Sequence, residues 1–157
     1  MKPCLLDTDI LSLFFRNHPQ VVHSCNLYLQ EYRQLSFSLI THYEILSGLK
    51  HRDAQKQLDK FLEFSRLNQI LLLTEESVTT SAKIYADLRK KGTPLDDIDL
   101  LIAGVAIANN LVLITHNQKH FSKIGSSRLC VIIFAYRIVK CLSGNTFRTI
   151  LSKKLSV

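Results

Sequence analysis

Short apolar runs alternate with longer amphipathic segments along this sequence, and this alternation leaves few possible folds. The runs lie at residues 5–6, 35–40, 70–73 and 111–114, and a further run at 131–134 is a candidate last strand. Between them, apolar residues recur with the 3.6-residue period of helices. Strands that alternate with helices predict an α/β domain around a mainly parallel sheet, and 157 residues fit one domain.

Two predicted helices differ in how much of their surface is apolar. Residues 100–108 are apolar at nearly every position, which predicts a helix buried on all sides. Residues 75–91 have one apolar face, which predicts an amphipathic helix that stops at Gly92. The inward face of this second helix is predicted to contain Val78, Ala82, Tyr85 and Leu88.

Polar side chains follow the predicted strands at the points where the chain leaves the sheet. Asp7 ends the first strand, Glu44 lies in the helix after the second, and Asn117 follows the fourth. Asp97 and Asp99 open the buried helix. In parallel sheets, binding sites lie beyond the carboxyl ends of the strands, so we expect these groups to converge at one edge.

Carboxylates that converge in this way repel one another unless cations lie among them. Mg²⁺ and Mn²⁺ prefer oxygen ligands and keep several waters, which leaves room for a substrate phosphate. A pair of such ions can activate a water and stabilise the leaving oxygen of a phosphodiester. The predicted edge therefore indicates metal-dependent phosphodiester chemistry.

The acids near the first two strands also have a structural interpretation. Asp7 is placed to cap the helix that follows it, and Asp9 would then be a first-turn acid favoured by the helix dipole. Thr41 and Glu44 have the spacing of a capping box, for a helix that starts at Thr41 and ends near Gly48. Capping and metal binding can coexist, so both roles stay open.

The acids before the buried helix are not equivalent. Asp96 fills the N-cap position, which leaves Asp99 without a capping role and favours a metal role for it. Asp97 cannot share the helical face of Asp99 and would have to ligate from the loop. His116 and His120 suggest a zinc or acid–base site, but no further His or Cys lies nearby, so we do not favour that alternative.

Charge is distributed unevenly along the chain, whose formal net charge is +7. All 13 acids lie at or before Asp99, together with 12 Lys and Arg, whereas the residues after Asp99 carry eight Lys and Arg and no acid. An acidic site beside a basic segment suits a polyanionic substrate. A basic surface without any such site would give the same numbers of charged residues, so charge alone does not decide between the two. We expect a cytoplasmic protein without a membrane partner, because no apolar run reaches the roughly 18–20 residues of a membrane span and the first residues do not resemble a signal peptide.

Four segments match, in order and spacing, the motifs of a known family. They are residues 5–10, Thr41-x-x-Glu44-Ile45-Leu46-x-Gly48, Gly92-x-x-Leu95-x-Asp97-x-Asp99-Leu100-Leu101-Ile102-Ala103, and Leu113-Ile114-Thr115-His116-Asn117-x-x-x-Phe121. Over about residues 4–125 the chain resembles the PIN domain, and it is most similar to the VapC toxins of VapBC toxin–antitoxin pairs.

The resemblance implies a three-layer α/β/α PIN-like domain and an endoribonuclease that depends on Mg²⁺, for which Mn²⁺ can substitute. It implies RNA as substrate, inhibition by a VapB-like antitoxin and commonly a homodimer. By motif, Asp7, Glu44 and Asp99 would be the catalytic acids that bind the metal, and Asp97 would be an auxiliary metal ligand.

The chain departs from the family pattern at two places. Asn117 stands where some members have a further acid, which would weaken a second metal site because an amide carries no charge. The end of the chain has no Trp and no acid, where members usually have acids and often a Trp. We therefore expect a PIN-like nuclease domain at residues 1–130 and a basic C-terminal extension at 131–157, with a last strand and an atypical tail.

Two other functions fit parts of the sequence. Asp7-Thr8-Asp9 has the D-x-D form of a haloacid-dehalogenase-type phosphohydrolase, in which the first Asp attacks phosphate. Leu11 stands where such enzymes usually have Thr or Val, so the four motifs favour the ribonuclease. The second alternative is a catalytically degenerate PIN-like protein that binds RNA or an antitoxin without cutting; Asn117 and the unusual basic end support it.

Overall fold

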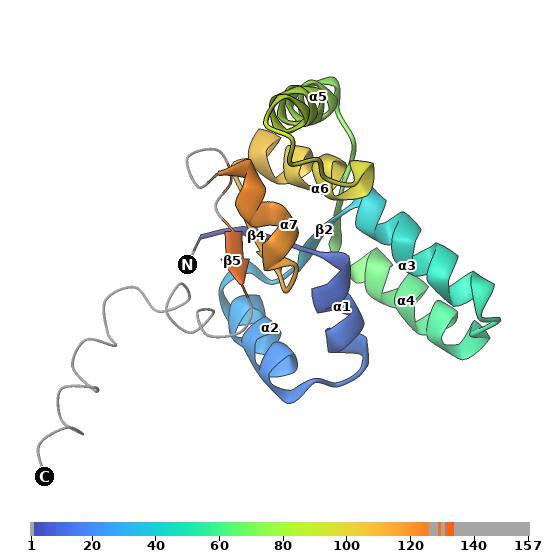
Figure 1. The fold of residues 1–157 in the computed structure, drawn as a ribbon. Coiled ribbons are helices and arrows are strands. Elements are labelled where there is room, and N and C mark those ends of the chain that lie inside the picture. Colours follow the sequence, from blue (N-terminus) through green and yellow to red (C-terminus); the bar gives the residue numbers. More distant parts are fainter. Residues whose placement is uncertain (1, 126–128, 130, 134–157) are drawn as a thin grey trace, which may run out of the picture.

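The computed structural model describes residues 2–125, 129 and 131–133, which form an α/β domain around one parallel sheet (Figure 1). The strand order is β3-β2-β1-β4-β5, and every neighbouring pair is parallel. The strands are β1 (Cys4–Leu6), β2 (Ser36–Ser38), β3 (Gln69–Leu71), β4 (Val112–Thr115) and β5 (Val131–Ile133). β1 and β4 are therefore neighbours in the sheet although they lie far apart in the sequence.

Helices cover both faces of this sheet. Because successive strand residues face opposite sides, Cys4 and Leu6 pack in one core cluster and Leu5 packs in the other. The helices are α1 (Thr8–Phe15), α2 (Pro19–Tyr32), α3 (Leu39–His51), α4 (Gln55–Leu67), α5 (Glu75–Lys90), α6 (Asp97–Ala108) and α7 (Gln118–Phe121), with the 3₁₀ helix η1 (Ser122–Ile124). The first cluster lies against α1, α2 and α4, and the second lies against α5 and α6. The predicted three-layer α/β/α arrangement is confirmed.

Helix α6 is buried as its composition predicted, but the inward face of α5 differs from the prediction. Ser77, Ser81, Ile84 and Leu88 are buried, whereas Val78 and Tyr85 are exposed. The cause is a close approach of the two helices: a Cβ at Gly104 of α6 would overlap the Ser81 side chain. Small serines permit this approach, and the Ser81 hydroxyl donates to the Leu100 carbonyl at 2.9 Å.

The predicted capping box at the start of α3 is wrong. The helix begins at Leu39, and its N-cap is Ser38, whose hydroxyl accepts from the Thr41 amide at 2.9 Å. Thr41 is therefore already inside the helix, and Glu44 lies one turn further on. Since Ser38 satisfies the Thr41 amide, Glu44 is not needed as a cap and is available for another role. The helix also continues past the predicted end near Gly48 to His51.

The second predicted strand is shorter than expected, and the third is less buried. β3 is an edge strand whose side chains are exposed or half-buried, and Leu72 beyond it is 63% exposed. The predicted strand at 70–73 therefore forms at Gln69–Leu71, but its predicted burial is wrong because the edge position leaves one side of the strand uncovered.

Within the described ranges, no helix is long and apolar enough to cross a membrane. Of the C-terminal extension predicted at 131–157, the structure describes β5, which pairs with β4. The basic end from residue 134 onward lies outside the described residues.

Candidate active site

Asp7 lies where β1 ends, at the carboxyl edge of the sheet. Its amide donates to the Ile114 carbonyl of β4, which continues the pairing of the two strands by one residue. Its side chain is the N-cap of α1 through the Thr8 amide at 2.8 Å, and it also accepts from the Thr115 hydroxyl at 2.7 Å. Burial, followed by the charges of Asp9 and Asp99, raises the pKa of Asp7 from 3.8 to about 7.

Asp9 lies in the first turn of α1 and is also tied to the end of β4. One oxygen accepts from the His116 amide at 2.8 Å and faces the Thr115 hydroxyl at 3.3 Å. That hydroxyl has one hydrogen and is closer to Asp7. The other oxygen, Oδ1, is buried without a hydrogen-bond partner among the described residues. Burial raises the pKa of Asp9, and the His116 amide together with the charge of the His116 ring offsets only part of this effect.

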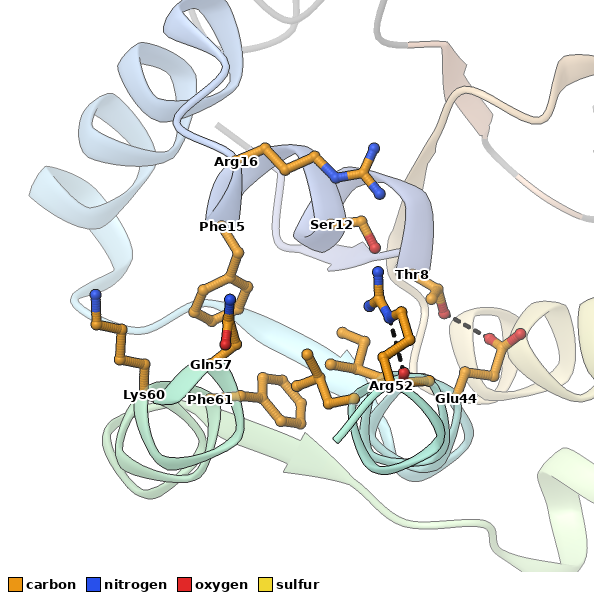
Figure 2. Close-up of a pocket in the computed structure, with 12 residues that line it drawn as sticks. Thr8, Ser12, Phe15, Arg16, Glu44, Arg52, Gln57, Lys60 and Phe61 are labelled. Carbon is orange, nitrogen blue, oxygen red and sulfur yellow. Dashed lines mark hydrogen bonds between the residues drawn. The ribbon is translucent and has the colours of Figure 1, made fainter. Parts of the chain in front are cut away.

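Glu44 reaches the same edge from α3. Its Oε2 accepts from the Thr8 hydroxyl at 2.5 Å (Figure 2). This bond joins α1 and α3 at the residue that follows Asp7. Partial burial raises the pKa of Glu44, and the charges of Asp99, Asp96 and Asp9 add to this effect. Glu44 therefore belongs to the acid cluster electrostatically, and it has no part in capping α3.

Asp99 and Asp97 both lie in the first turn of α6 but differ in their surroundings. The Asp99 side chain is 15% exposed, and its Oδ2 lies 2.5 Å from Nδ1 of His120. Asp97 is exposed, and no hydrogen bond or ion pair of its side chain occurs among the described residues. The predicted N-cap at Asp96 is confirmed, since its side chain accepts from the Ile98 amide.

Asn117 is connected to Asp99 through His120. Its side-chain Nδ2 lies 2.8 Å from Nδ1 of His120, the same nitrogen that faces Asp99. Its backbone amide donates to the Thr115 hydroxyl oxygen at 2.9 Å. Its side chain makes no capping hydrogen bond to α7. Asn117 therefore does not cap this turn through its side chain.

The charges of Asp9 and Asp99 act on both Asp7 and Glu44, so the structure brings these four acids to one edge of the sheet. Asp9 was expected only as a first-turn acid of its helix, whereas Asp97, which was expected at this edge, is exposed. In their present positions, no three His, Cys, Asp or Glu of the described residues form a group that could hold a metal ion. The chemistry of the donors nevertheless fits a hard divalent cation: all four are carboxylates, and one buried oxygen of Asp9 lacks a partner.

Sequence reasoning missed three partners of these acids. Thr8 orients Glu44, Thr115 orients Asp7, and His120 is the counter-charge of Asp99 when protonated. Thr8 and Thr115 each lie beside a strand end, and that position was the available signal. His120 was considered only as part of a zinc or acid–base site.

Comparisons with known proteins agree with this architecture. The PIN domain model matches residues 4–126. Ribonuclease VapC1 of Methanocaldococcus jannaschii is 33% identical over 76% of this chain and 79% of its own length. The tRNA(fMet)-specific endonuclease VapC of Salmonella typhimurium is 29% identical over 82% of this chain and 97% of its own length. The crystal structure of DNA-bound VapBC from Salmonella typhimurium superposes with a TM-score of 0.74 at 26% identity, over 85% of this chain and 99% of that one.

The match places Asp7-Thr8-Asp9 in a PIN domain rather than in a haloacid-dehalogenase-type phosphohydrolase. It spans the whole acid cluster, from β1 through α7. The chain belongs to the PIN domain family, and its relatives within that family include the VapC ribonucleases.

Proposed function

We propose that this protein is a metal-dependent endoribonuclease and the toxin of a type II toxin–antitoxin pair. The observation that carries the proposal is the cluster of Asp7, Asp9, Glu44 and Asp99 at the carboxyl edge of a PIN-domain sheet. Relatives named ribonuclease or endonuclease VapC support RNA as the substrate.

The acids have separate roles in this proposal. Asp7, Glu44 and Asp99 would hold Mg²⁺, or Mn²⁺ in its place, with Asp97 as an auxiliary ligand. The bound cation would supply an activated water and stabilise the leaving oxygen of the phosphodiester. Thr115 and the Thr8 amide hold the Asp7 carboxylate in one orientation, and the Thr8 hydroxyl holds Glu44. These contacts leave little freedom for the two acids, so they are oriented before substrate binds.

The same proposal includes the partners. Relatives of known structure are titled VapBC complexes, which supports a VapB-like antitoxin for this chain. We also propose that the chain forms a homodimer and acts in the cytoplasm, where its RNA substrate occurs. The PIN-like domain at residues 1–130 would then suffice for catalysis, with the basic segment 131–157 as an extension.

Cleavage of labelled RNA, including a tRNA panel, tests this function. The wild type should cut RNA in Mg²⁺ or Mn²⁺ and stop when a chelator is added. Asp7→Asn should not cut under any of these conditions. RNA or antitoxin binding by the wild type without any cleavage would instead identify the catalytically degenerate protein considered above.

A further inference from the structure

A cavity of about 580 Å³ opens directly beside the acid cluster, between α1, α3 and α4 (Figure 2). Thr8 and Glu44 line one end of it, so the cavity and the acids share a wall. The function proposed above uses only that end. The rest of the cavity, away from Glu44, is formed by side chains that have no role in the acid cluster.

Those remaining walls are rich in positive charge. Arg16 directly after α1, Arg52 directly after α3 and Lys60 of α4 line the cavity, and Glu44 is the one acid among the lining residues. All three cations are exposed, and none forms an ion pair with a described residue. Arg52 donates from Nε to the Gly48 carbonyl at 2.9 Å, which orients the guanidinium and leaves its outer nitrogens available.

The close-up shows how these groups lie relative to the acids. The Arg52 side chain rises from the end of α3 toward Ser12 and Thr8, and Arg16 extends above Ser12 (Figure 2). Lys60 lies at the opposite end, beside Gln57 and Phe15 (Figure 2). Positive charge therefore continues from the neighbourhood of Glu44 to the far end of the cavity.

An aromatic ring completes the lining. Phe15 is 36% exposed and points into the cavity, while Phe61 beneath it is fully buried. Grooves that bind single-stranded nucleic acid combine positive charges along the backbone with aromatic rings on which bases stack. Both features occur here on the side of the cavity that continues away from the acids.

We propose that this cavity binds the RNA strand on one side of the bond to be cut. Arg52 and Arg16 would contact the phosphates nearest the acid cluster, Lys60 a more distant phosphate, and Phe15 a base. The proposal rests on the ribonuclease function above and adds a substrate-binding site to it. The alternative occupant is a segment of the antitoxin, and the experiment below separates the two.

The test compares Arg16→Gln/Arg52→Gln with Lys83→Gln/Lys90→Gln. Both double variants remove two exposed positive charges, but Lys83 and Lys90 lie on α5, outside the cavity. The Arg16→Gln/Arg52→Gln protein, which we call the pocket variant, should have a KM for single-stranded RNA at least tenfold above that of the wild type. The Lys83→Gln/Lys90→Gln protein, the α5 variant, should have the wild-type KM. In an Asp7→Asn background, the dependence of log Kd on log salt should fall by about 0.7 for each lost phosphate contact.

A second variant guards against a loss of structure. Arg52→Lys keeps the charge and should recover part of the lost salt dependence if the site binds phosphate. Equal KM values in wild type and pocket variant, or equal losses in the pocket and α5 variants, would overturn the proposal. A pocket variant that escapes antitoxin inhibition but keeps its KM for RNA would overturn it in favour of the antitoxin. A wild type that cuts no RNA would instead contradict the proposed function.

Discussion

The two halves of the acid cluster are held in different ways. Asp7 and Asp9, at the ends of β1 and β4, are fixed by neutral donors: the Thr115 hydroxyl and the amides of Thr8 and His116. Asp99, on α6, faces a side chain that can carry a positive charge, His120. In the first half, burial outweighs the neutral donors and the charge of His116. In the second half, Asp99 directly contacts an imidazole, which is a counter-charge when protonated.

This difference bears on where the proposed cation would contribute most. Neutral donors hold a carboxylate in place, but their hydrogen bonds do not cancel the effect of burial. Burial therefore raises the pKa values of Asp7 and Asp9. A divalent ion would supply the missing charge in the first half. In the second half it would compete with His120 for Asp99. Substitutions in the two halves should therefore differ in their effects on stability even where they abolish the same activity.

Asp7→Asn should have the largest effect. Loss of a metal ligand removes several kcal/mol of transition-state stabilisation, so cleavage should fall at least about a thousand-fold. The metal-free variant should be more stable than the wild type, because a pKa raised from 3.8 to about 7 costs up to about 4 kcal/mol once the group is charged. This gain in the free energy of unfolding should be absent below pH 4, grow as the pH rises and be complete above pH 7. Thermal melts across this pH range and a cleavage assay check both results. If Asp7→Asn is no more stable than the wild type at pH 8, burial does not raise the pKa of Asp7 as described.

Asp99→Asn should also abolish cleavage, but with little change in stability. The pair with His120 is partly exposed, and such pairs contribute about 0–1 kcal/mol. Asp97→Asn is the matched control: it removes the same charge from the same turn of α6 at an exposed position. It should lower cleavage much less than Asp99→Asn does. Equal losses in the two variants, measured at saturating Mg²⁺, would mean that the Asp99 face has no special role.

Glu44→Gln should abolish cleavage while the free energy of unfolding changes little, because Ser38 and not Glu44 caps α3. Ser38→Ala should show the reverse. It should lose about 1 kcal/mol of stability through the cap and keep its activity. Urea titrations and cleavage assays on both variants test this separation. If Glu44→Gln instead cuts RNA normally, Glu44 is not a catalytic acid.

Asn117→Asp should have the smallest effect. It adds a carboxylate 2.8 Å from His120 in the more open half, where a second ion is expected to bind weakly. The variant should bind that ion more tightly and need less Mg²⁺ for cleavage. Calorimetric titration of the two free proteins measures this directly. Identical stoichiometry and affinity would exclude Asn117 from the metal site.

The sequence predicted the half of the site that depends on strand ends. Asp7 comes directly after an apolar run, so its position at the sheet edge required only the assumption of a parallel sheet. Its contact with Thr115 joins residues 108 positions apart and depends on β1 pairing with β4. The order of strands in a sheet is not visible in local periodicity, so this contact could not be predicted.

The other half depends on features with weaker local signals. Helix α7 has four residues, too few to show a period, so nothing in the sequence placed His120 beside Asp99. The start of α3 was misplaced because Ser38 and Thr41 are both good N-caps, and the tertiary structure uses the earlier one. The face of α5 was misassigned because buried serines at a close helix contact resemble a solvent-exposed face.

If the carboxylates at the sheet edge hold a divalent ion as proposed, the free wild-type protein should bind Mn²⁺, as measured by electron paramagnetic resonance. Asp97→Asn should bind Mn²⁺ nearly as well, and Asp7→Asn should not bind it. Equal Mn²⁺ binding by the wild type and Asp7→Asn would contradict the proposed metal site.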